Sequence, residues 1–276
     1  MTDRLIGRSD LLRTASRLLQ RGDAGAAVVG PRGSGVSRLL IQLVADGRAQ
    51  GRRVQFLVAP GPEGCLPPAD PAADLLVVDD AHRLDAAAAE ALRAAAVGGS
   101  VQLVAGWHTS DPVPEALGWC AASGLLARLD VTPFDVDDVV AYLESRFGAG
   151  IHRASAATLR RYGAGLPAWV VPACDAALAA GRLERRAGLW RCTAPGPPTP
   201  AMLDRARREL EQLGTADADK RCLLTLRPPG SPGTAPHPVA AVMSNAAHAS
   251  GSIAHGPGPS GTSRPRRERA APGVGA

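Results

Sequence analysis

The chain contains 276 residues, of which 45% are hydrophobic and only 3% aromatic. This length can supply a sizeable core, and the hydrophobic content excludes a chain that is disordered throughout. So few aromatic residues argue against a protein that mainly stacks on single-stranded nucleic acid. The net charge is +5, but residues 228–276, with four arginines and one glutamate, carry +3 of it, which leaves +2 for the rest. The sequence therefore does not support direct nucleic-acid binding by the folded part.

The cysteines are far apart and form no C-x-x-C pair, so they predict neither a zinc site nor a disulfide framework. The N-terminus carries charges too early for a secretory signal, and no apolar run approaches the roughly 18 residues that span a bilayer. We therefore expect a soluble cytoplasmic protein with no membrane partner. The cysteines are Cys65, Cys120, Cys174, Cys192 and Cys222.

Apolar runs and amphipathic stretches alternate along residues 1–134. Runs without strand-like alternation indicate strands that are buried on both faces, and hence a parallel sheet covered by helices. The expected fold class is therefore α/β, with a parallel sheet flanked by helices. The expected elements are helices at residues 11–20, 37–49 and 86–96, and strands at residues 26–29, 54–58, 75–78, 101–105 and 129–131.

The remainder of the chain divides into two parts. Residues 135–227 are dominated by helical patterns and are expected to form a helical lid, in which Pro167 starts a helix and Pro172 interrupts it. Residues 228–276 contain 17 glycines and prolines among 49 residues and no aromatic residue. Such a segment cannot bury enough apolar surface to offset its ordering entropy, so we expect a disordered tail.

A glycine-rich run follows the first expected strand. It matches the phosphate-binding pattern G-x-x-x-x-G-K-[ST] except that the lysine is replaced by Val36. Its backbone N–H groups could surround a phosphate at the positive end of a helix, and the Ser37 hydroxyl could bind magnesium. Arg32 is a candidate substitute for the lysine, whereas Arg38 is expected to point away. The candidate nucleotide-binding residues here are Gly30, Pro31, Arg32, Gly33, Ser34, Gly35, Val36, Ser37 and Arg38.

A second pattern lies about 45 residues further on, where four apolar residues precede Asp79 and Asp80. Carboxylates at the carboxyl end of a buried strand lie where open α/β sheets bind ligands. Asp79 would then hold magnesium, and Asp80 would position or activate the attacking water as the candidate catalytic residue. The alternative is that the two aspartates only form a turn or cap a helix. Likewise, the glycine-rich run could be a turn that binds no ligand.

Three further segments support a family resemblance. Residues 5–8 read Leu-Ile-Gly-Arg, residues 77–85 read Val-Val-Asp-Asp-Ala-His-Arg-Leu-Asp, and residues 165–167 read Gly-Leu-Pro. With the glycine-rich loop, their order resembles the signal-transduction (STAND) branch of AAA-type ATPases found in large LuxR-type transcriptional regulators. The resemblance covers residues 1–227 and implies a P-loop NTPase parallel sheet flanked by helices, followed by a helical lid. It implies that ATP or ADP binds with Mg2+, that Ile6 and Arg8 cover the adenine, and that Pro167 approaches the base.

The sequence differs from this family at two positions where the family has residues that act on the nucleotide. Val36 replaces the lysine, and Trp107 stands where the family ends its fourth strand with a polar sensor residue. His108 or Thr109 could serve instead, although a satisfied surface histidine is the simpler reading. Nothing after residue 227 resembles the family's sensor repeats or its helix-turn-helix.

The sequence therefore favours a nucleotide-dependent signalling or transcription-regulator switch with weak or no hydrolysis. Its partner would be an unidentified protein or a second copy of the chain. Three alternatives stay open: a degenerate interaction module that does not hydrolyse nucleotide, a DNA-binding regulator, and a truncated or frame-shifted remnant of a LuxR-type regulator.

Overall fold

The computed structural model describes residue 5 and residues 7–22, 24–60 and 66–212. The expected tail at residues 228–276, the last part of the expected lid and Ile6 lie outside the described residues.

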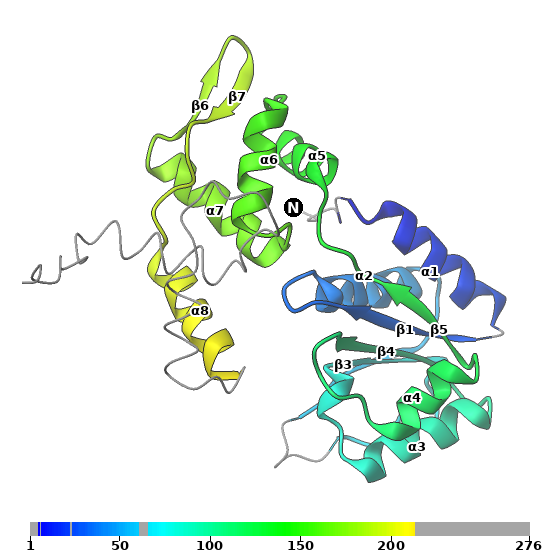
Figure 1. Ribbon diagram of the computed structural model, residues 1–276. Coiled ribbons are helices and arrows are strands. Elements are labelled where there is room, and N and C mark those ends of the chain that lie inside the picture. The colour runs from blue at the N-terminus through cyan, green and yellow to red at the C-terminus, as the bar shows by residue number, and fades with distance from the viewer. Residues whose placement is uncertain (1–4, 6, 23, 61–65, 213–276) are drawn as a thin grey trace, which may run out of the picture.

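Five parallel strands form one sheet in the order β5-β1-β4-β3-β2 (Figure 1). The sheet confirms the parallel α/β architecture expected from the sequence. All six residues of β1 and all five of β3 are buried, as required of strands covered on both faces. The strands are β1 (Gly25–Gly30), β2 (Val54–Val58), β3 (Leu75–Asp79), β4 (Gln102–His108) and β5 (Leu126–Asp130).

Helices cover the two faces of the sheet. On one face, α1 (Ser9–Arg21) and α2 (Val36–Ala49) bury leucines such as Leu39 and Leu40 against the strands. On the other face, α3 (Ala86–Val97) and α4 (Glu115–Ala122) bury Leu92 and Leu117. A short 3-10 helix, η1 (Ala81–Arg83), follows β3. The two apolar layers hold the strands in place and fix their carboxyl ends at one edge.

That edge gathers the loops that carry the candidate chemistry. In the sheet register, Gly30 of β1 lies beside His108 of β4, and Val78 of β3 lies beside Ala105 of β4. The segments that follow β1, β3 and β4 therefore leave the sheet together. In open α/β sheets this is the edge where ligands bind.

A second group of elements forms its own core around Trp169, which is fully buried. A capping box between Asp135 and Asp138 begins α5. The elements are α5 (Val136–Phe147), α6 (Arg153–Tyr162), α7 (Pro167–Ala179), the antiparallel hairpin β6 (Leu183–Arg186) and β7 (Leu189–Cys192), and α8 (Pro200–Gln212).

Two details of the helical part differ from the expectation. The predicted interruption at Pro172 is wrong, because α7 continues through it to Ala179. Buried neighbours on both sides of the proline, including Trp169 and Ala173, hold the helix together despite the missing N–H group. The hairpin of β6 and β7 was not foreseen, because its strands are rich in arginine and mostly exposed.

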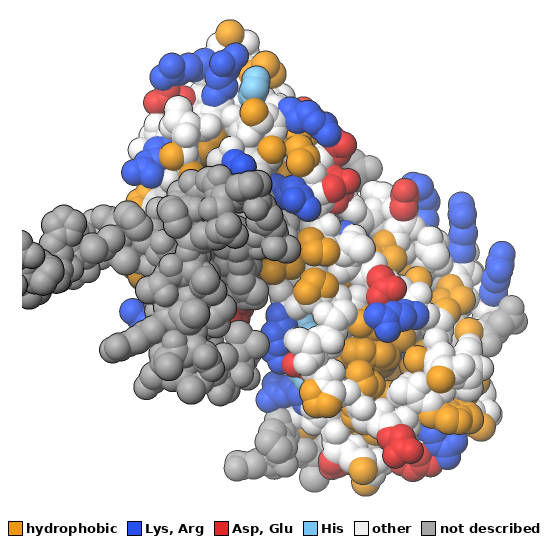
Figure 2. Space-filling view, in the orientation of Figure 1, with side chains coloured by type: hydrophobic (Ala, Val, Ile, Leu, Met, Phe, Trp, Pro, Cys, Tyr) orange, Lys and Arg blue, Asp and Glu red, His pale blue; other side chains and the backbone are white. Residues whose placement is uncertain are grey.

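The visible surface carries no single charged face. On the part of the molecule uncovered in Figure 2, arginine and acidic side chains are interspersed over both halves. Within the described part of the chain, every helix is too short or too polar to cross a lipid bilayer.

Candidate functional site

The glycine-rich loop joins β1 to α2, and its backbone requires glycine. Gly33 and Gly35 have φ angles of 81° and 101°, in the left-handed region that other residues rarely adopt. A Cβ atom added to Gly30 would lie 2.6 Å from the carbonyl oxygen of Val131. The loop therefore has a tight path that larger residues could not follow.

The N-terminus of α2 has hydrogen-bond donors that are not used within the described part of the chain. The first N–H groups of a helix have no intrahelical acceptor, and Gly35, the N-cap of α2, offers no side-chain cap. The hydroxyl group of Ser34 is buried in the loop and has no hydrogen-bond partner among the described residues. Donors gathered at the positive end of a helix dipole suit a phosphate group.

Val36 occupies the position of the missing lysine and belongs to the core. It is only 3% exposed, and its Cγ1 atom would lie 3.0 Å from a Cβ atom added to Gly106 of β4. This valine packs α2 on the sheet and cannot provide a charge. Ser37 is half-buried, and Arg38 is exposed. Any cation that faces the loop must come from another residue.

Arg32 lies in the loop, but its side chain is engaged by Asp111 in the segment after β4. The Arg32 Nη2 atom lies 2.8 Å from both carboxylate oxygens. Burial alone would raise the pKa of Asp111, but the hydrogen bond from Arg32 and the nearby positive charges outweigh it and lower that pKa. To replace the lysine, Arg32 would have to leave this ion pair.

Asp79 and Asp80 end β3 in different environments. The Asp79 side chain is buried, and its Oδ1 atom accepts a hydrogen bond of 2.9 Å from the backbone N–H group of Asp80. Asp80 has a φ angle of 52°, and its carboxylate lies 3.9 Å from Arg83. Asp80 occupies the N-cap position of η1, but its side chain makes no capping hydrogen bond. The start of α3 is capped by Asp85, whose carboxylate accepts from the N–H group of Ala88.

Two histidines join this edge of the sheet. The sequence offered His108 as a candidate sensor but did not indicate that His82 would lie beside it. His82 in η1 and His108 at the end of β4 lie with their rings 5.3 Å apart. Both face the same oxygen of Asp111, with His82 Nε2 at 3.2 Å and His108 Nδ1 at 3.3 Å. His108 is mostly buried and therefore is not the surface histidine that the sequence suggested. Trp107, beside it, is buried in the sheet.

The Gly-Leu-Pro segment of the helical part contacts the glycine-rich loop. Pro167 is the first residue of α7, and the N–H group of the next residue, Ala168, donates a hydrogen bond of 3.2 Å to the carbonyl oxygen of Gly33. Gly165 has a φ angle of 71° and its carbonyl oxygen accepts from Phe134 at 2.7 Å. This segment anchors the start of α7 next to the loop.

Arg205 of α8 also lies near the loop. Its Nη2 atom would be 3.8 Å from a Cβ atom added to Gly33. The guanidinium stacks over Trp169 and pairs with Glu209 at 3.1 Å. This cation could be found only from the tertiary structure, because 172 positions separate Arg205 from Gly33 in the sequence.

Arg8 is buried against the segment between β5 and α5. Its guanidinium hydrogen-bonds to Thr132 and lies 5.0 Å from the centre of the Phe134 ring. Burial lowers the pKa of Arg8, although the carboxylates of Asp138 and Asp135 oppose this change. Arg8 therefore ties the N-terminal segment to the start of the helical part.

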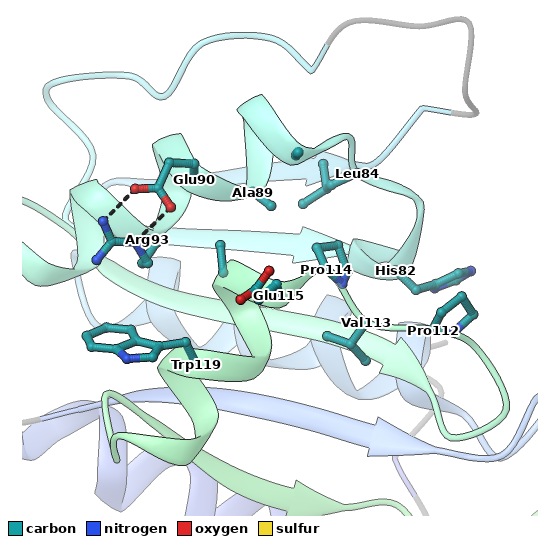
Figure 3. Close-up of a pocket in the computed structure, with 12 residues that line it drawn as sticks. His82, Leu84, Ala89, Glu90, Arg93, Pro112, Val113, Pro114, Glu115 and Trp119 are labelled. Carbon is teal, nitrogen blue, oxygen red and sulfur yellow. Dashed lines mark hydrogen bonds and ion pairs between the residues drawn. The ribbon is translucent and has the colours of Figure 1, made fainter.

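A separate cavity of about 730 Å³ lies between α3 and α4. Figure 3 shows His82 and Pro112 at one end of it and Trp119 near the other, with the ion pair between Glu90 and Arg93 beside Trp119. The cavity opens on the opposite face of the sheet from α2, and His82 connects it to the carboxyl edge.

Comparison with solved structures supports the fold. A point mutant of RuvB from Thermotoga maritima is similar with a TM-score of 0.50 and 16% identity, over 81% of this chain and 77% of that chain. The RuvB Holliday junction branch migration motor of the same organism has a TM-score of 0.47 and 17% identity, over 82% and 77% of the two chains. AMPPCP-bound DnaA from Aquifex aeolicus has a TM-score of 0.43 and 14% identity, over 56% of each chain.

At these identities the similarity concerns the fold alone. The support for the fold comes from the RuvB point mutant, whose TM-score is 0.50. Together with the strand order and the loop after β1, it gives the chain the architecture of a P-loop NTPase. No protein-family model matches the chain, and no curated protein matches it.

Proposed function

We propose that the loop at residues 30–37 binds the phosphate groups of ATP or ADP and that the chain acts as a nucleotide-dependent switch. The observation that carries this proposal is the turn between β1 and α2. It combines two glycines of positive φ, an uncapped helix start and a buried, unpartnered serine hydroxyl group. These features suit a phosphate.

The oxygen ligands for magnesium are Ser37 and Asp79 in this proposal. Magnesium prefers oxygen ligands, and its charge would offset that of the outer phosphates. Asp79 uses one carboxylate oxygen to hold the backbone of Asp80, so its second oxygen would serve the ion. Asp80, which is more exposed, would position a water molecule near the outer phosphate.

Hydrolysis is expected to be weak or absent. The valine at position 36 provides no ammonium group, and the loss of one charge-assisted hydrogen bond costs about 1.5–3 kcal/mol, or roughly 10–100-fold in affinity. We propose that Arg205 partly fills this role, because its guanidinium lies beside the loop. Its ion pair with Glu209 would have to open when nucleotide binds.

The switch would work through the contact between the loop and α7. Because Ala168 hydrogen-bonds to Gly33, a phosphate that reshapes the loop would also change how the helical part is held. A regulatory role of the STAND type, in which the lid reports the bound nucleotide to a partner, is consistent with this arrangement.

A second candidate function is an interaction module that does not bind nucleotide. Two observations favour it. Position 36 is a buried valine in place of a charged lysine, and the charge of Arg32 is balanced by its ion pair with Asp111, so the loop offers little positive charge to a phosphate. Under this proposal the fold would be kept as a platform for a protein partner.

A pair of glycine substitutions distinguishes the two candidates. Gly35 and Gly51 lie at opposite ends of α2, both with positive φ, and neither would bring an added Cβ within 4 Å of another atom. Each change to alanine therefore introduces a similar backbone strain of about 1 kcal/mol. We expect Gly35→Ala to weaken the binding of labelled ATP and Gly51→Ala to leave it unchanged.

The titration uses the full chain with labelled ATP and ADP, with and without Mg2+. If the unmodified chain binds neither nucleotide, the interaction module becomes the better proposal. If both variants bind equally well, nucleotide binds somewhere other than this loop.

A further inference from the structure

Three side chains with metal-binding atoms meet at the carboxyl edge of the sheet. Asp80 follows β3, His82 lies in η1 and His108 ends β4. One ligand atom from each lies within 4.8 Å of those from the other two. In a tetrahedral site with bonds near 2.1 Å, ligand atoms lie about 3.4 Å apart, so small side-chain rotations would bring these three around one ion.

The two histidine side chains are largely, but not fully, buried, and their hydrogen bonding is incomplete. The His82 side chain is only 9% exposed and that of His108 only 14%. Neither Nδ1 atom makes a hydrogen bond of good geometry with the described residues, although His108 Nδ1 lies 3.3 Å from Asp111. Buried polar atoms in folded proteins nearly always have a partner, so the Nδ1 atom of His82 suggests a ligand.

Asp111 orients His82 for binding through the other ring nitrogen. Its Oδ2 atom lies 3.2 Å from His82 Nε2, which as an N–H group would donate to the carboxylate. The proton on Nε2 leaves the lone pair on the unpartnered Nδ1. A carboxylate that fixes the back of a ligating histidine in this way is the usual outer partner in metal sites.

The charges in the cluster restrict the kind of ion. Asp111 is already balanced by Arg32, and Asp80 lies near Arg83. An ion bound mainly by charge, such as Mg2+ or Ca2+, would gain little here. Ions that form strong bonds to imidazole nitrogen, above all Zn2+, would gain most.

From these contacts we propose that Asp80, His82 and His108 bind one divalent transition-metal ion of the Zn2+ type, with Asp111 orienting His82. Three protein ligands leave a fourth position for water. Of these residues, His82 also lines the cavity between α3 and α4 (Figure 3). The proposed magnesium ligands, Ser37 and Asp79, are not part of this site. Asp80 is shared with the water-positioning role proposed above, so the metal site is tested without nucleotide.

The test is a titration of the chelator-treated full chain with Zn2+ by calorimetry and with Co2+ by visible absorption. We expect one ion per chain. Removal of a residue that hydrogen-bonds to a metal ligand costs about 10–100-fold in metal affinity. His82→Gln and His108→Gln each remove a ligand itself, so each should weaken Zn2+ binding at least as much. His152→Gln, at an exposed histidine before α6, is the matched control and should bind Zn2+ like the unmodified chain.

Asp80→Asn provides a second route if a histidine variant fails to fold, because it preserves size and should still weaken Zn2+ binding. The proposal is overturned if the unmodified chain binds no Zn2+, or if the ion remains as tightly bound in the His82, His108 and Asp80 variants. It is equally overturned if the Co2+ spectrum shows the intense near-ultraviolet bands of cysteine thiolates, because the ion would then lie elsewhere.

Discussion

The backbone N–H group of Ala168 donates a hydrogen bond of 3.2 Å to the carbonyl oxygen of Gly33. This bond joins the first turn of α7 to the glycine-rich loop after β1, across 135 positions of the sequence. A Cβ atom on Gly33 would lie 3.0 Å from that of Ala168, so the two backbones can approach this closely only because position 33 is glycine. The helical part therefore rests directly on the proposed phosphate site.

Arg205 provides the first prediction. Its guanidinium lies beside Gly33, whereas Arg207 on the same helix is exposed and pairs with Asp204 at 2.9 Å. We expect Arg205→Gln to weaken ATP binding by roughly 10-fold, as one charge-assisted contact is lost, and Arg207→Gln to have no effect. Labelled-ATP titrations of both variants check this. Equal affinities for the two would show that Arg205 does not contact nucleotide.

Val36 provides the second prediction. Val36→Lys should tighten ATP binding by roughly 10–100-fold, and more for ATP than for ADP, because the lysine reaches the outer phosphates. The same change should lower the free energy of unfolding by about 1–3 kcal/mol, since Val36 is buried against Gly106. Val36→Met is the uncharged control for the longer side chain. A folded lysine variant with no gain over the methionine variant would favour the interaction module.

Asp79 allows the structural role of its carboxylate to be separated from metal binding. Asp79→Asn keeps the Oδ1 acceptor that holds the N–H group of Asp80 but removes the charge. We expect the variant to keep its melting temperature while its nucleotide binding no longer depends on Mg2+. The check is the ATP titration with and without the ion. An unchanged response to Mg2+ in a folded variant would mean that Asp79 has only a structural role.

Much of the fold could be predicted from the sequence. The strand at Val54–Val58 has the predicted bounds, because this mainly apolar and β-branched run lies between two arginines and a proline. The helix α4 could not be predicted, since its sequence follows an Asp-Pro-Val-Pro segment and contains Gly118, both typical of a loop. The continuation of α7 past Pro172 depends on packing that no local pattern reveals.

The candidate site was only partly predictable. The loop after β1 and the aspartates after β3 are local patterns, and the structure brings them to one edge of the sheet. The meeting of His82 with His108 and Asp111 joins the segment after β3 to the end of β4 and the segment that follows it. Their spacing matches no metal motif, so only the sheet register could show that β3 and β4 end side by side.

Gly165 tests how the helical part is anchored. Its φ angle is 71°, and an added Cβ would lie 2.4 Å from the carbonyl oxygen of Phe134. Gly165→Ala should therefore destabilise the chain by about 2–4 kcal/mol, combining backbone strain with a steric clash. Gly22→Ala, at a φ angle of 77° with no atom within 4 Å, should cost only about 1 kcal/mol. Urea unfolding of both variants measures the difference, and equal losses would show that the contact with Phe134 is unimportant.

The most direct test of the central claim is to follow the backbone amide resonances of the loop by NMR while ATP or ADP is added to the isotope-labelled chain. If the loop binds phosphate, the amide signals of Gly33, Gly35, Val36 and Ser37 should shift together and saturate at one nucleotide per chain. The account would be contradicted if these signals stayed unchanged at saturating nucleotide, or if the shifts were confined to residues around the cavity between α3 and α4.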